Sequence, residues 1–120
     1  MATGGFSDYQ INEWLAQVRT GYLALHYDNP DIAGAYASEV FGGSYSRQQY
    51  TMTQPTNKGM LLLNPVIFTG LPSVLVIYVA GWDNVNGGNY RWSAPLPTPH
   101  TVLEGKTISI PAQTIGISLA

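Results

Sequence analysis

Residues 73–93, SVLVIYVAGWDNVNGGNYRWS, decide the fold of this chain: an apolar run, a turn dense in Asn and Gly, and a short aromatic run. Within 73–82 both alternate sets of side chains are apolar, so a strand here is covered on both faces. Residues 83–89 supply Asn and Gly, which tolerate the positive φ angles of a turn. Residues 90–93 alternate aromatic and polar side chains on a returning strand. The stretch therefore predicts a β-hairpin, with the rest of the chain as its cover.

The segments that flank this hairpin also have the patterns of short strands. A further hairpin is expected at 101–110, around the Glu104-Gly105 turn, and the prolines of 94–100 predict an extended crossing segment between the two hairpins. Pro65 makes 60–69 either two short strands or one edge strand with a bulge. Residues 28–31 have turn chemistry and 32–44 are expected to form a surface loop of fixed shape. The remaining strand segments are 21–27, 45–54 and 114–119.

One amphipathic helix is predicted at about residues 8–20. Ser7 can cap it with Gln10 in capping-box spacing, and Gly21 suits the position after its end. Its apolar residues fall on one stripe, so the helix packs by one face, on the domain or on a neighbouring copy. These residues are Ile11, Trp14, Leu15 and Val18.

Together these patterns predict a mainly β protein. The expected fold is a single antiparallel β-sandwich or jelly-roll-like domain of about eight strands, with one short N-terminal amphipathic helix. Residues 1–20 are expected to form the N-terminal arm and helix, and residues 21–120 the β-sandwich, within one folding unit.

Composition narrows the classes of function. Only 10% of the residues are charged, against roughly a quarter in ordinary soluble domains. The five basic residues are scattered and the net charge is −2, which argues against nucleic acid as a partner. The chain has no cysteine, so thiolate chemistry and zinc–thiolate sites are excluded. The N-terminal residues have no signal-peptide pattern, and the longest apolar run is too short to span a bilayer.

The candidates for chemistry all have simpler structural explanations. His26, near Asp28, could act as a base with Ser44 or Ser46 as nucleophile, but a half-buried strand histidine is the simpler interpretation. His100 is expected to be a loop histidine. The carboxylates that could form a glycosidase pair are Asp28, Asp31, Glu39, Asp83 and Glu104.

Oxygen ligands for calcium could come from 28–31 or from Asp83, Asn84 and Asn86, although turn chemistry explains both groups. The sequence therefore predicts no catalytic residues, no cofactor and no metal site. Among the aromatic residues, Trp82, Tyr90 and Trp92 could form a sugar-stacking platform, but packing in a core or an interface is favoured over carbohydrate binding.

Two strings resemble a known family. YLALHYDNP at 22–30 with EVFGGSYSRQ at 39–48 resembles the "LxLHTADP … EVSGGxYARQ" opening of small β-sandwich virion proteins of tailed phages, common in phages of actinobacteria. The hairpin through Asp83 and 87–89, and PHTV with EGKTISI at 99–110, are similar to later motifs of that family. The resemblance covers nearly the whole chain and implies a fold and a virion setting, without a catalytic motif.

The leading hypothesis is accordingly a non-enzymatic capsid decoration protein that binds the outside of a phage head and stabilises it. Its expected partners are the major capsid protein and copies of itself, as a trimer. The alternative is a tail-fibre or tail-tip subunit, which would contact tail proteins or a host-surface glycan. A carbohydrate-binding module or hydrolase is a third class. The candidate interface residues are Phe6, Tyr9, Trp14, Tyr36, Phe41, Tyr90 and Trp92.

Overall fold

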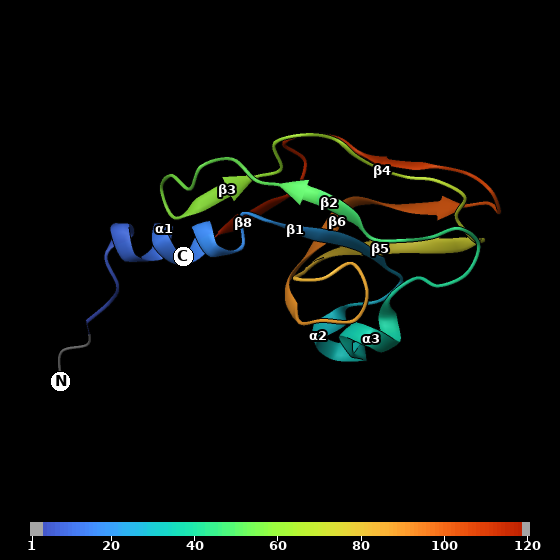
Figure 1. Ribbon diagram of the computed structural model, residues 1–120, viewed down its shortest axis with the longest axis horizontal. Coiled ribbons are helices and arrows are strands. Elements are labelled where there is room, and N and C mark those ends of the chain that lie inside the picture. The colour runs from blue at the N-terminus through green and yellow to red at the C-terminus, as the bar shows by residue number, and fades with distance from the viewer. Residues whose placement is uncertain (1–3, 119–120) are drawn as a thin grey trace.

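The computed structural model describes residues 4–118 and shows antiparallel strands with a helix extending from one end (Figure 1). The helices are α1 (Asp8–Gln17), α2 (Pro30–Ala33) and α3 (Ala35–Ser38). The strands are β1 (Thr20–His26), β2 (Gln48–Thr51), β3 (Gly59–Leu61), β4 (Val66–Phe68), β5 (Val74–Trp82), β6 (Tyr90–Val102), β7 (Ile108–Ile110) and β8 (Gly116–Ser118). The predicted mainly β class, with eight strands and an N-terminal helix, is confirmed.

The main sheet has the strand order β2-β1-β5-β6. The predicted central hairpin is its core: β5 pairs with β6 in antiparallel register, and β1 pairs with the other edge of β5. The sequence predicted a separate crossing segment at the three prolines, but this segment is part of β6. It is tolerated there because β6 is an edge strand, whose outer N–H groups have no ladder partner to lose.

The β5–β6 pair has an irregularity in register between Val76 and Tyr78, with the extra residues on β6. Val76 pairs with His100 but Tyr78 pairs with Pro95, so residues 96–99 lie opposite Ile77 alone. Within β5, Val76 and Val79 are both buried in the main cluster although they are three residues apart, so burial does not alternate strictly along this strand.

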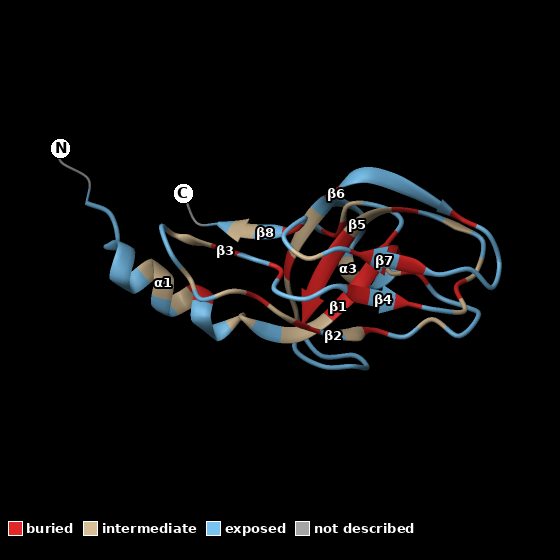
Figure 2. Cartoon of the chain, turned by 90° about the horizontal axis from the view of Figure 1, so that it is seen from above, coloured by how far each residue is buried: buried red, intermediate tan, exposed pale blue. Residues whose placement is uncertain are grey.

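Two short strand pairs, β4–β7 and β3–β8, complete the fold. The main hydrophobic cluster joins β4 and β7 to β1 and β5, which makes two layers (Figure 2). Residues 60–69 form two strands, one of the two alternatives. The predicted hairpin at 101–110 is wrong, because β7 pairs with β4 and β6 pairs with β5. The turn at Gly105 does form, but it is held by hydrogen bonds to the backbone of buried Leu71.

A smaller cluster lies on the opposite face of the main sheet. Ala24, Ala80 and Trp82 are fully buried there, with Ala35 and Tyr90 packed against them. The later half of β5 is thus covered on both faces, as its lack of a polar face predicted. The cover comes from 30–38, where a turn and a surface loop of fixed shape were expected and the short helices α2 and α3 form instead. Asn29 caps α2 by accepting from the Asp31 N–H (3.0 Å), and Pro30 occupies the first turn.

Helix α1 begins as predicted and ends earlier. The Ser7 hydroxyl accepts from the Gln10 N–H (3.2 Å), but Val18 is the C-cap. Gly21 is not a helix-terminating residue, because it lies within β1 opposite Tyr50. A Cβ there would collide with the Arg91 guanidinium, which explains the glycine. Leu15 is buried in the main cluster, so the C-terminal half of the helix is packed on the domain.

Candidate functional site

The most elaborate polar arrangement of the molecule is centred on Arg47, just before β2. Its side chain is only 4% exposed, and it forms a bidentate ion pair with Glu39, from Nη2 to Oε1 (2.8 Å) and from Nε to Oε2 (2.9 Å). Paired, charge-assisted hydrogen bonds of this kind are the strong ones in proteins. The ion pair therefore fixes the segment after α3 against the start of β2.

Arg47 also holds the loop between β5 and β6. Its Nη1 donates to the carbonyl oxygens of Asn84 (2.9 Å) and Gly87 (2.6 Å), and its guanidinium carbon lies 3.9 Å from the centre of the Trp82 ring. At least four of its five N–H groups are thus engaged, and its planar face is stacked on an aromatic ring. One side chain sets the position of residues 83–89.

Glu39 is bound from a second direction by Tyr45. The Tyr45 hydroxyl donates to Glu39 Oε2 (2.7 Å) and accepts from the Leu25 N–H (3.1 Å). Burial and the adjacent Glu39 carboxylate raise the pKa of Tyr45 well above its usual value. Burial works against the charge of Arg47, but the hydrogen bonds and charge of Glu39 outweigh it and raise the pKa of Arg47. Both groups stay protonated at any physiological pH.

The loop at 83–89 has further contacts that fix its shape. Asp83 accepts from the Asn89 N–H (2.7 Å) and from the Asn89 side-chain amide (2.9 Å), which lowers the pKa of Asp83. Tyr36 of α3 donates its hydroxyl to the Gly88 carbonyl. Tyr90 donates to Asp31 of α2 (2.8 Å). We refer to α2, α3 and residues 83–89 together as the loop cap; they lie side by side over the main sheet (Figure 1).

A groove lies at the border of the loop cap, above the ion pair. It has a volume of about 320 Å³, and Glu39, Tyr45 and Arg47 lie along it together with exposed aromatic and amide groups. Tyr36 is 65% exposed and Phe41 is 80% exposed. The other lining residues are Val40, Gly42, Ser46, Val85, Asn86 and Gly87.

The predicted base and nucleophiles do not come together. His26 is fully buried, and its Nδ1 lies 2.9 Å from the hydroxyl of buried Ser38, not near an accessible Ser44 or Ser46. The Trp82 indole N–H points to its Nε2 at 3.5 Å. Burial lowers the pKa of His26 to about 4, with Glu39 raising it and Arg47 lowering it further. A group enclosed in this way has no path to a substrate.

Three of the carboxylates considered for metal or sugar chemistry have structural partners instead: Asp31 accepts from Tyr90, Asp83 accepts from Asn89, and Glu39 pairs with Arg47. His100 was expected in a loop but is an exposed residue of β6. Within residues 4–118, no group of three or more His, Asp or Glu side chains is placed to hold a metal ion. None of the helices in this range is long and apolar enough to cross a membrane.

The candidate interface residues differ in their exposure to solvent. Phe6 and Tyr9 are exposed near or on α1, and half-buried Trp14 packs edge-on against Phe6. Tyr36 and Phe41 are exposed at the groove, and Tyr90 is half-buried beside Trp82. Trp92 was predicted as an interface residue, and this prediction is wrong. The residue is 8% exposed and packs edge-on against Tyr50 in the main cluster. Since Trp82 is fully buried as well, the proposed sugar platform of Trp82, Tyr90 and Trp92 does not exist on the surface.

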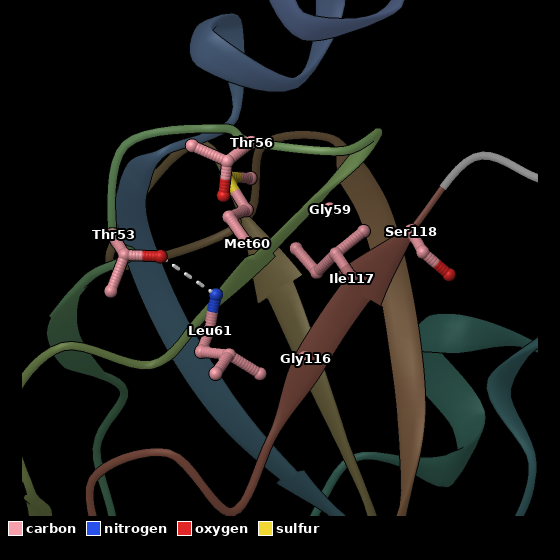
Figure 3. A pocket seen from close by; sticks show the side chains of 8 residues that line it. All are labelled: Thr53, Thr56, Gly59, Met60, Leu61, Gly116, Ile117 and Ser118. Atoms are coloured by element: carbon pink, nitrogen blue, oxygen red, sulfur yellow. Dashed lines mark hydrogen bonds between the residues drawn. The ribbon is translucent and has the colours of Figure 1, made fainter.

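A second depression lies at the opposite end of the domain, beside α1 (Figure 3). It has a volume of about 490 Å³ and lies along β3 and β8. Thr53 accepts from the Leu61 N–H there (3.0 Å), and Met60 and Ile117 contribute apolar surface. None of its eight lining residues is titratable, so it offers apolar contact rather than chemistry.

The sequence interpretation missed the Glu39–Arg47 pair as a site. The signal was present, because Glu39, Tyr45 and Arg47 are all in the EVFGGSYSRQ string, and Asp83, Gly87 and Gly88 belong to the hairpin motif. Glu39, Tyr45 and Arg47 form one connected hydrogen-bond network with the backbone of the loop at 83–89.

The antiparallel β domain with its clamped loop surface and enclosed histidine is compatible with a structural or binding protein. The sequence model of the Gp80 family, described as podophage GP4 fiber I protein gp80, matches residues 6–118. The chain belongs to this family and is a structural protein of a bacteriophage particle. No curated protein matches the sequence.

Proposed function

We propose that the protein is a tail-fibre or tail-tip subunit whose loop cap contacts the host surface. The observation that carries this proposal is the fibre-family match, which covers α1, the whole β domain and every residue of the ion-pair network. This match favours the fibre alternative over the head-decoration hypothesis. The link to actinobacterial phages and the head location remain predictions from the sequence.

The geometry supports a division between attachment and contact. Helix α1 extends from one end of the domain, where β3 and β8 also lie (Figure 2). Tyr9 on this helix and Phe6, just before its N-cap, are exposed. We infer that this end packs on copies of the same chain or on neighbouring tail proteins. The loop cap lies on a different face, and the hydrogen bonds of buried Arg47 fix its position. A rigid surface is suited to binding, because little conformational freedom is lost when a partner docks.

The protein is proposed to act by binding and not by catalysis. Its internal histidine is enclosed, and the Glu39 carboxylate at the groove is already bound by Arg47 and Tyr45. Neither group is arranged to transfer a proton to a ligand.

Antibody-gold labelling of intact phage particles tests the location. We expect label at the tail and a copy number far below that of the major capsid protein. Label spread over the head, with a copy number comparable to that of the capsid protein, would contradict the fibre proposal and restore the decoration hypothesis. Purified protein is also expected to reduce phage adsorption by competing for the host surface.

A further inference from the structure

The groove beside the loop cap has exposed aromatic rings at its rim. Phe41 is 80% exposed and is not part of the ion-pair network around Arg47. Tyr36 packs edge-on against Trp82 and is still 65% exposed. Aromatic faces that stay in water at a concave site favour ligands with an apolar, C–H-rich face. Val85, on the opposite loop, adds a further apolar contact.

Charge along the groove is balanced. Arg47 is the single basic residue among the groove-lining residues of the described chain, and Glu39 neutralises it through two hydrogen bonds. An anionic ligand would have to displace Glu39 or accept its repulsion. A cationic ligand would meet a carboxylate that already accepts three hydrogen bonds. The groove therefore favours a neutral ligand.

Hydrogen-bonding groups line the same groove. The Asn86 side-chain amide can donate and accept, the Ser46 hydroxyl can do both, and the Glu39 carboxylate is 14% exposed. A ligand with several hydroxyl groups can use all three. The volume of about 320 Å³ is near the lower bound of ordinary ligand sites, so it fits a short segment of a chain-like ligand.

We propose that this groove binds a neutral saccharide unit, with one face of the sugar ring stacked on Phe41 or Tyr36 and its hydroxyl groups bound to Asn86, Ser46 and Glu39. The inference rests on the proposed host-contact function, which would make the natural ligand a neutral glycan of the bacterial surface. It moves the sugar contact from the buried Trp82 and Trp92 to residues on the surface.

Amide-resolved NMR titration of the purified full chain tests the site directly. The probes are the methyl glycosides of glucose, galactose, mannose, rhamnose and N-acetylglucosamine, with galacturonate as the charged comparator. We expect saturable shifts at Gly42, Ser46, Asn86 and Gly87 with at least one neutral sugar. Phe41→Ala and Asn86→Ala are each expected to weaken binding about tenfold. Leu103→Ala is the control, because Leu103 is also solvent-facing (65% exposed) and does not line the groove.

Several results would overturn the glycan site. They are no saturable shift with any neutral sugar of the panel, galacturonate binding as tight as the neutral sugars, or shifts that persist unchanged in Phe41→Ala. Chemical shifts of the unliganded variants outside the groove show whether each variant is folded. If groove shifts occurred only on mixing with another tail protein, the groove would be a protein-docking surface instead.

Failure of this site and failure of the proposed function give different results. A protein that labels the tail but ignores every sugar keeps the fibre function and loses the glycan site. A protein that binds sugar through Phe41 but labels the head keeps the site and loses the fibre function.

Discussion

At the scale of single residues, the main feature is a buried ion pair in a chain with very few charges. Ion pairs of this kind contribute little net stability compared with apolar packing, but removing one partner leaves an uncompensated charge in the interior. The value of Glu39–Arg47 lies in placement, since Arg47 alone contacts both the segment after α3 and the loop at 83–89.

Glu39→Gln is expected to lower the free energy of unfolding by about 3 kcal/mol, because Arg47 then stays charged and buried without its partner. Urea denaturation of the purified protein measures the change. The double variant Glu39→Gln/Arg47→Met is expected to recover part of the loss, since it removes the orphaned charge.

The matched control breaks an exposed ion pair. An Asp8 carboxylate oxygen lies 3.4 Å from the Lys58 ammonium, and the two side chains are 66% and 41% exposed. Asp8→Asn is expected to cost less than about 1 kcal/mol. Equal losses in Glu39→Gln and Asp8→Asn would show that the buried pair does not have the role assigned to it.

His26 gives the protein a pH dependence with a definite sign. Its neutral form suits the site, because the Trp82 N–H faces Nε2 and leaves Nδ1 to donate to Ser38. Burial lowers its pKa from 6.5 to about 4, Glu39 opposes this and Arg47 adds to it. Between these two values the unfolded chain binds the proton and the folded chain does not.

The contribution of neutral His26 to the free energy of unfolding is therefore expected to be fully present above pH 6.5. It is expected to fall by about 3 kcal/mol as the pH drops from 6.5 towards 4. Urea denaturation at a series of pH values measures the slope. His26→Gln should flatten the curve in this window, whereas the exposed His100→Gln should leave it as in the wild type. A wild-type curve that is flat between pH 4 and 6.5 would contradict the enclosed, neutral histidine.

At the scale of elements, local patterns predicted what local interactions build. The 73–93 hairpin and the Ser7-capped start of α1 depend on neighbours in sequence, and both are confirmed. The prediction of a hairpin at 101–110 was wrong because its turn also fits a connection between sheets. The pairing was decided by the burial of Ile108 and Ile110 against β4. The helix end at Gln17 was missed because β1–β2 pairing, a long-range contact, takes Thr20 and Gly21.

The groove could be predicted only in part for the same reason. Turn residues such as Asp83 and Gly88 carry a visible signal, and Tyr36 and Phe41 are aromatic residues of a predicted surface loop. Nothing in the residue spacing shows that Arg47 reaches across to residues 84 and 87, because that contact depends on how β2 and the β5–β6 loop are arranged in space.

Helix α1 gives an element-scale prediction about the folding unit. Leu15 is buried in the main cluster, whereas Tyr9 on the same helix is 67% exposed. Leu15→Ala is expected to cost about 3 kcal/mol of unfolding free energy through lost burial and a residual cavity. Tyr9→Ala should change it by less than about 0.5 kcal/mol. Thermal and urea unfolding measure both; a negligible cost for Leu15→Ala would mean that the helix is not packed on the domain in solution.

At the scale of the whole molecule, the domain is elongated, with extents of 54 × 29 × 26 Å, and α1 forms one end. Few charges and exposed apolar side chains at that end are unusual for a protein that functions alone in water. The apolar depression along β3 and β8 lies next to the same helix (Figure 3). A helix that presents aromatic rings beside an apolar depression is suited to exchange contacts with a second copy of the chain.

The double variant Phe6→Ser/Tyr9→Ser is therefore expected to reduce self-association without unfolding the domain. Sedimentation equilibrium should give a multiple of 13.0 kDa for the wild type and a mass close to 13.0 kDa for the variant. Phe41→Ser, which changes an even more exposed aromatic residue at the groove, should keep the wild-type mass. A wild type that sediments as a monomer at all accessible concentrations, or a variant that stays associated, would remove α1 as the contact between copies and leave neighbouring tail proteins as its partner.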